Sequence, residues 1–186
     1  MKMDCALVLI DFQVGFEDPA WGARNNPDAE AKAARLLTAW RATGAPVVHV
    51  RHLSKTPGSP LSGTGTAWMP ALAPLEGETC VEKSVNAAFI GTGLEAALRA
   101  QDVTDLVIAG LTTPHCVSTT CRMAANLGFR VILAHDACAA FAANADESWQ
   151  GTSKRHLTPD AIHNAAISHL HGEFVTARAV TDILTQ

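Results

Sequence analysis

The sequence has few charged residues, and this shortage excludes several classes of protein. Only 17% of its 186 residues are Asp, Glu, Lys or Arg, and the formal net charge is -4. A nucleic-acid-binding domain needs a concentrated basic surface, and no basic cluster in this sequence could supply one. Polybasic runs that attach a protein to a membrane surface are also missing. We therefore expect neither a nucleic-acid partner nor a membrane partner.

Long hydrophobic runs are missing as well. The apolar run near the amino terminus, Cys5 to Ile10, ends at Asp11. It is too short for the core of a signal peptide or for a membrane span. The sequence therefore predicts a cytoplasmic protein.

The cysteines and serines lack the spacings of several common sites. There are five cysteines, so they cannot all pair, and no two of them have CxxC spacing. This indicates neither a disulfide scaffold nor a zinc site. The GxSxG turn of serine α/β-hydrolases is absent too, which excludes that class.

The residues that are present suit a single domain spanning 1–186. The hydrophobic content is 48%, enough for a full core in a chain of this length. Because few charges remain for the surface, we expect part of the surface to be a subunit interface in a homo-oligomer, a dimer or a tetramer.

Short apolar segments alternate with amphipathic segments along the whole chain. Short runs containing β-branched residues predict strands buried on both faces, and the longer amphipathic segments predict helices. This alternation predicts a three-layer α/β/α fold with a mainly parallel, six-stranded, Rossmann-like sheet. The expected strands are 6–10, 46–50, 80–83, 106–109, 130–134 and 173–175, and the expected helices include 27–43, 92–100, 159–171 and 177–185.

The stretch 105–128 reads as strand, tight turn and helix, and it places Cys116 at the start of the helix. Thr113 is the expected cap, Pro114 fits the first turn, and Gly128 can end the helix. Free N–H groups and the helix dipole favour a thiolate at such a position, so Cys116 is a candidate nucleophile. The alternative is a buried structural cysteine, because free cysteine is among the most buried residue types.

Two further residues are candidates because of where they fall. Asp11 follows the first expected strand, where open α/β sheets bind their ligands, although it could instead be a loop or cap residue. Lys83 ends the third expected strand before an uncharged segment, so it needs an anionic partner unless it is a solvated surface lysine. In the Pro-rich loop 53–78, Trp68 is the only large aromatic residue and could cover a ligand or simply anchor the loop.

Three sequence blocks in this order resemble the isochorismatase-like cysteine hydrolase superfamily, which also contains nicotinamidases and N-carbamoylsarcosine amidohydrolases. The blocks are LVLIDFQ at 7–13, EKSVNAAF at 82–89, and LVIAGLTTPHCVSTTCRMAANLGFRV at 106–131 followed by DACAAF at 136–141. The resemblance implies a catalytic triad of Asp11, Lys83 and Cys116. It also implies a cis peptide bond between Leu111 and Thr112 that aims N–H groups at an oxyanion.

The resemblance also implies a reaction class. Metal-using relatives place an Asp and two His after the second strand, where this chain has Arg51-His52-Leu53-Ser54, so we expect no metal and no other cofactor. Cys116 favours a hydrolase that cleaves a C–N bond of a small amide, lactam or carbamoyl compound through an acyl intermediate. A vinyl ether hydrolase of the isochorismatase type and a non-catalytic or redox-sensing protein are the alternatives. The expected substrate-binding residues are Phe16, His52, Trp68, Phe89, Thr113 and His115.

Overall fold

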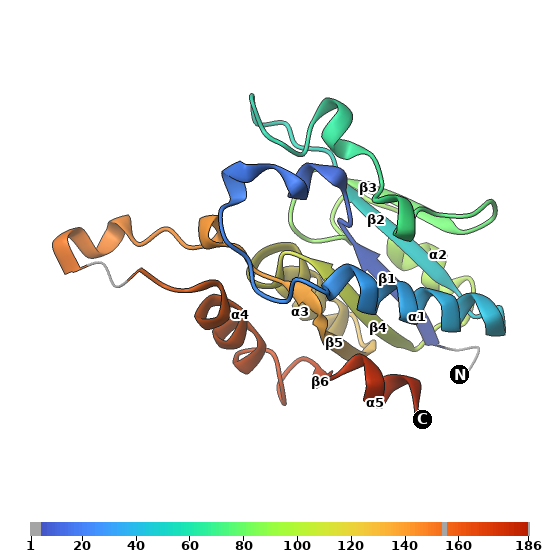
Figure 1. Ribbon diagram of the computed structural model, residues 1–186. Helices are drawn as coiled ribbons and strands as arrows, with labels where there is room; N and C mark the ends of the chain where they lie inside the picture. Colours follow the sequence, from blue (N-terminus) through green and yellow to red (C-terminus); the bar gives the residue numbers. More distant parts are fainter. Residues whose placement is uncertain (1–4, 154–155, 186) are drawn as a thin grey trace.

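The computed structural model describes residues 5–153 and 156–185, and these form a single six-stranded sheet with helices on both faces (Figure 1). All five strand pairs are parallel, which confirms the predicted three-layer α/β architecture. In spatial order the strands are β3 (Thr79–Lys83), β2 (Val47–His52), β1 (Cys5–Ile10), β4 (Asp105–Leu111), β5 (Arg130–Ala139) and β6 (Thr176–Arg178).

The strand order reverses direction between β1 and β4. From β1 the chain adds β2 and β3 on one side, and it then returns to place β4, β5 and β6 on the other. In open parallel sheets a ligand-binding crevice lies at this switch point, outside the carboxyl ends of the strands. Asp11 follows β1 and Cys116 follows β4, so the topology brings these two candidates to one crevice.

The helices divide into two layers. α1 (Ala29–Thr43) and α5 (Val180–Leu184) pack on one face of the sheet, with the buried Leu36, Leu37 and Trp40 of α1 filling that core (Figure 1). α2 (Leu94–Arg99) and α3 (Ser118–Asn126) cover the opposite face, and α4 (Pro159–Ser168) contacts β5 and the turn that precedes α3. Both faces of the sheet are therefore buried, as continuous apolar strands require.

Strands β1 and β4 approach each other unusually closely at Gly110. A Cβ atom added to Gly110 would lie 2.3 Å from the carbonyl oxygen of Ile10, so only glycine fits. The pairing of β4 with β5 shifts register at the same level, between Ile108 and Gly110. Along the chain, this irregularity comes just before the turn that carries Cys116.

The carboxyl-terminal elements differ from the sequence prediction. The last strand is Thr176–Arg178 and not 173–175, because the backbone of that segment is engaged in a turn. Val175 N–H donates to the Leu170 carbonyl, and Gly172 N–H donates to the Val175 carbonyl. Helix α4 accordingly ends at Ser168, earlier than predicted, while Thr158 caps its start as a side-chain acceptor for Ala161 N–H.

No helix within residues 5–153 and 156–185 combines the length and the hydrophobicity that crossing a bilayer would require.

Candidate active site

The ammonium group of Lys83 connects the three residues proposed as a triad. Its Nζ donates to Asp11 Oδ2 at 2.7 Å and to Cys116 Sγ at 3.2 Å. The side chains of Asp11 and Lys83 have no exposed surface. A buried carboxylate and a buried ammonium are tolerated only when paired in this way.

Each member of this group comes from the carboxyl end of a different strand. Lys83 is the last residue of β3, Asp11 follows β1, and Cys116 lies in a π-helical turn after β4. Asp11 has a left-handed backbone conformation, with φ of 55°, which Asp adopts more readily than most residues. Its N–H donates to the Val50 carbonyl at 2.7 Å, which fixes the turn at the end of β1.

His52 is the third partner of the Lys83 ammonium. Its Nδ1 lies 3.1 Å from Lys83 Nζ, so the three N–H donors of the lysine each have an acceptor. Burial and the neighbouring Lys83 charge lower the pKa of His52 to about 4, so the ring is neutral and can accept this bond. Gln13 holds the same strand end, because its amide exchanges two hydrogen bonds with the backbone of His52.

Cys116 is held as a thiol, which corrects the expectation of a thiolate. Burial raises the pKa of its thiol to about 12, and the Asp11 carboxylate adds to this while Lys83 opposes it. The turn around Cys116 is a π-helical segment that precedes α3, and Cys116 is only 7% exposed, so a thiolate there would be largely desolvated. Burial also raises the pKa of Asp11, although Lys83 opposes this shift too. Burial therefore disfavours the charged form of both groups.

The turn after β4 contains a cis peptide bond between Leu111 and Thr112. The carbonyl of Thr112 accepts from the N–H groups of His115 and Val117, both at 3.2 Å. Thr113 does not cap the helix, which corrects that expectation. Its hydroxyl instead pairs with Nδ1 of His163 on α4 at 2.8 Å.

A cavity of about 190 Å³ opens onto Cys116. Of the residues expected to bind substrate, Phe16, His52 and His115 line it, together with Thr112. The structure places the other three elsewhere. Thr113 contacts His163, Trp68 packs against His49 with ring centroids 5.8 Å apart, and Phe89 stacks on Phe129 at 6.0 Å.

Six residues that line the cavity were not identified from the sequence. One of them had a usable signal: Asn86 stands three residues after Lys83, within one of the three sequence blocks, and its Oδ1 lies 3.9 Å from Cys116 Sγ. The other five lie outside the three sequence blocks, so no motif in the sequence marked them as parts of a binding site. The six are Trp21, Ser54, Ser59, Leu61, Asn86 and Asn144.

Three residues bring potential metal-ligand atoms close together: Asp11, His52 and Cys116. The three atoms lie within 4.8 Å of one another, and this geometry could hold a metal ion. The Nζ atom of Lys83, however, contacts all three residues. A metal ion bound here would have to displace that ammonium group, and the positive charge of Lys83 would repel it.

Comparison with known proteins identifies the family of this chain. Residues 5–178 match the model of the isochorismatase domain family. The uncharacterized isochorismatase family protein YrdC of Bacillus subtilis (strain 168) is 40% identical over 178 residues, which cover 95% of this chain and 92% of that protein. Maleamate amidohydrolase of Pseudomonas putida is 29% identical over 193 residues, covering 92% of this chain and 82% of the relative.

A solved structure shows the same fold. An isochorismatase family protein from Chromobacterium violaceum ATCC 12472 superposes with a TM-score of 0.91 and 44% identity, covering 99% of this chain and 93% of that one. The family model spans most of the chain, including all six strands. The chain therefore belongs to the isochorismatase family and is a hydrolase of that family.

Proposed function

We propose that this hydrolase cleaves a C–N bond of a small amide, lactam or carbamoyl compound through an acyl intermediate on Cys116. The observation that carries the proposal is the position of Lys83 Nζ, bonded to both Asp11 Oδ2 and Cys116 Sγ. A thiol that opens onto a cavity, with a carboxylate and an ammonium beside it, has the parts of an activated nucleophile. The similarity to maleamate amidohydrolase, named for an amide-cleaving activity, also supports this reaction class.

The first half of the reaction transfers the Cys116 proton. Because burial raises the pKa of both Asp11 and Cys116, the two groups compete for one proton beside the Lys83 charge. Asp11 takes this proton as Sγ attacks the substrate carbonyl carbon, and Lys83 stabilises the negative charge on either partner. The N–H groups of Thr112 and Cys116 are the proposed donors to the oxyanion.

In the second half, that proton passes to the leaving nitrogen and a proton from water replaces it on Cys116. The carboxylic acid form of Asp11 protonates the leaving nitrogen, the C–N bond breaks, and an acyl thioester remains on Cys116. Asp11, again a carboxylate, then accepts a proton from a water molecule that attacks the thioester. As the C–S bond breaks and the carboxylic acid product leaves, Asp11 gives the proton that it took from water to Cys116 Sγ.

Rapid quenching during turnover tests this proposal. The protein is mixed with a panel of small primary amides and lactams, quenched in acid and digested, and the Cys116 peptide is weighed by mass spectrometry. We expect the mass of the acyl group on Cys116 with any amide that turns over, and no adduct in Cys116→Ala. Turnover should persist in EDTA, since Lys83 occupies the point where a metal would bind. A fully active Cys116→Ala protein would end the proposal.

A further inference from the structure

The wall of the cavity is built from uncharged groups. One side is apolar and aromatic, formed by Phe16, Trp21 and Leu61. The rings of Phe16 and Trp21 lie 4.9 Å apart, and Trp21 Nε1 donates to the Gly15 carbonyl at 2.9 Å, which fixes the indole. This side offers packing surface and no countercharge for an ionised ligand.

The polar side of the cavity is also neutral. Asn86 and Asn144 present carboxamides, and Oδ1 of Asn144 is fixed by the Phe141 N–H at 2.8 Å. The two imidazoles, His52 and His115, are uncharged near neutral pH because burial lowers the pKa of both. Amides and rings of this kind donate and accept hydrogen bonds without supplying a net charge.

Among the described residues, the cation bonded to Cys116 is Lys83, and its hydrogen bonds are already in use. All three N–H donors of Lys83 are directed at Asp11, His52 and Cys116, and the Lys83 side chain has no exposed surface. Two grooves share residues with the cavity. The one that shares Ser59 is bordered by the acidic Glu17 and Asp18, and the one that shares Ser54 is bordered by Lys55 and Lys83 together with Glu82, whose charge opposes theirs. A carboxylate entering the cavity would therefore lose water without gaining an ion-pair partner, which is costly.

From this lining we infer that the site takes small amides whose body is uncharged, and that it discriminates against substrates carrying a carboxylate. The inference rests on the proposed amide hydrolysis and adds the substrate class to it. The cavity volume of about 190 Å³ is below the roughly 300–1,000 Å³ typical of sites for drug-sized ligands, so the substrate is small. The amide-cleaving relative is named for maleamate, an anion, so the two proteins would differ in specificity.

Alkylation of Cys116 tests the charge preference without requiring turnover. Iodoacetamide and iodoacetate have nearly the same size and differ in one group, a carboxamide against a carboxylate. Peptide mapping gives the second-order rate constant of each reagent at Cys116, and the iodoacetamide constant is divided by the iodoacetate constant. This ratio is then divided by the same ratio for 2-mercaptoethanol, which removes the intrinsic difference in reactivity between the two reagents. We expect the normalised ratio to favour iodoacetamide by about tenfold or more, because the carboxylate is desolvated without a partner. A normalised ratio of one, or one favouring iodoacetate, would overturn the inference.

A pair of variants at the cavity wall provides a matched control. Ser54 lines the cavity, and in Ser54→Lys a cation is added there, whereas Ser54→Met adds a side chain of similar length without charge. We expect Ser54→Lys to lower the normalised ratio severalfold and Ser54→Met to leave it near the wild-type value. Equal ratios in the two variants would contradict an electrostatic origin.

A substrate pair separates this inference from the proposed function. Maleamide and maleamate have the same skeleton, and only maleamate is charged. We expect maleamide to be hydrolysed with the higher kcat/KM and to protect Cys116 from iodoacetamide at lower concentration. A preference for maleamate in protection would overturn the charge inference even if acyl-Cys116 forms. Absence of acyl-Cys116 with every amide would instead reject the proposed function, while the alkylation ratio still decides the charge preference.

Discussion

Lys83 is the hydrogen-bond and charge partner of both Asp11 and Cys116. With Lys83 in place, the buried Asp11 carboxylate has an ion-pair partner, and its second oxygen, Oδ1, has no hydrogen-bond partner among the described residues. A buried unpaired carboxylate oxygen is costly in a purely structural role, whereas it is available to receive a proton in a catalytic one. The unpaired Oδ1 atom therefore supports the proton transfer that we propose for Asp11.

Single and double substitutions at Asp11 and Cys116 distinguish acyl transfer from vinyl ether hydrolysis. If Cys116 is acylated, Cys116→Ser and Asp11→Asn should each lower kcat by several orders of magnitude. The double variant should be little worse than either, because residues that act as one unit are not additive. Steady-state kinetics with one amide that turns over would give kcat for the wild type, the two single variants and the double variant.

The vinyl ether alternative predicts a different pattern. Protonation of the vinyl carbon needs an acid and no thiolate, so Asp11→Asn would abolish turnover while Cys116→Ala kept much of it. Assays of both variants with isochorismate and with the amide panel provide the comparison. Additive losses in the Asp11→Asn, Cys116→Ser double variant would contradict the acyl-transfer mechanism.

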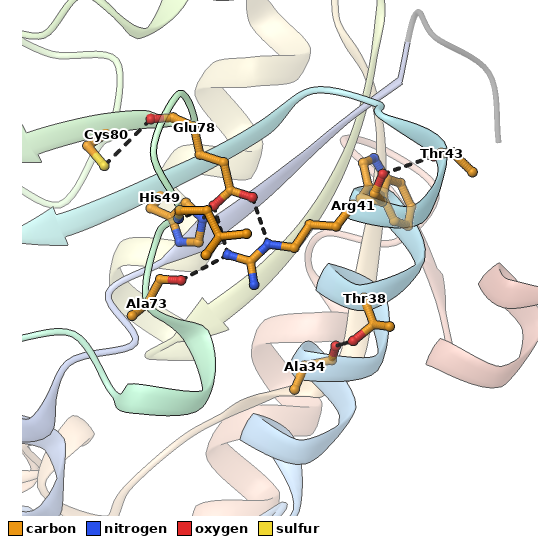
Figure 2. A network of polar contacts seen from close by, with 10 residues as sticks. Ala34, Thr38, Arg41, Thr43, His49, Ala73, Glu78 and Cys80 are labelled. Carbon is orange, nitrogen blue, oxygen red and sulfur yellow. Dashed lines mark hydrogen bonds and ion pairs between the residues drawn. The ribbon is translucent and has the colours of Figure 1, made fainter.

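At the scale of elements, a polar network holds α1, β2 and the loop before β3 together at the end of the sheet remote from Cys116. Figure 2 shows Arg41 of α1 reaching the Glu78 carboxylate, which it contacts through Nε at 2.7 Å and Nη2 at 2.8 Å. His49 of β2 lies 2.8 Å from the same carboxylate, and Leu75 N–H donates to it. The network therefore joins three segments through a single side chain.

Glu78→Gln should destabilise the fold without impairing catalysis. The change removes one charged acceptor from the Arg41 pair and leaves His49 with a weaker partner, which costs about 1–3 kcal/mol in the free energy of unfolding. The kcat should stay near the wild-type value, because Glu78 precedes the start of β3 and Lys83 ends it, about 17 Å apart along the strand. Urea unfolding would measure the loss, with Glu76→Gln, an exposed position in the same loop, as the control.

Strands and their ends could be predicted from sequence because buried parallel strands leave a strong local pattern. The apolar runs before Asp11 and around Ile108 predicted the two central strands. The family resemblance predicted that Lys83 acts together with the residues that follow these strands. The same principle failed at β6, because backbone hydrogen bonds at Val175 close a turn instead of pairing with β5.

The cavity wall was less predictable because its residues meet only through tertiary packing. Trp21 and Phe16 of the wall both pack against Phe141, a residue far from them in sequence that does not itself line the cavity, with ring centroids 5.8 Å away in each case. Trp68 was the more conspicuous aromatic residue, but its ring packs against His49 and Arg51. Hydrophobicity shows that such rings are buried, but not which neighbours they meet.

At the scale of the whole molecule, composition led to predictions that concern more than one chain or its surroundings. The low charged fraction predicts a homo-oligomer, and the short apolar run at the amino terminus predicts a cytoplasmic location. Both stay predictions.

Buried neutral histidines should make the whole fold sensitive to mild acid. Burial, and next the nearby His135, lower the pKa of His163 to about 4, although Asp160 and Asp136 oppose the shift. Since this value lies below the 6.5 of an unfolded histidine, the unfolded chain binds the proton first as the pH falls. The stabilising contribution of a neutral His163 is thus complete above about pH 6.5 and is lost between about pH 6.5 and 4.

Replacing His163 should flatten this dependence. A glutamine can still bond to the Thr113 hydroxyl but does not titrate. Between pH 7 and 5 we expect the wild-type free energy of unfolding to fall by about 1–2 kcal/mol more than that of His163→Gln, after allowance for screening by solvent. Urea unfolding at pH 7, 6 and 5 would measure both, with the exposed His169→Gln as the control that should retain the wild-type slope. The contradicting outcome is a parallel loss of stability in wild type and His163→Gln. It would mean that the pKa of His163 is the same in the folded protein as in the unfolded chain. The burial of His163 against Thr113 would then make no contribution to acid sensitivity.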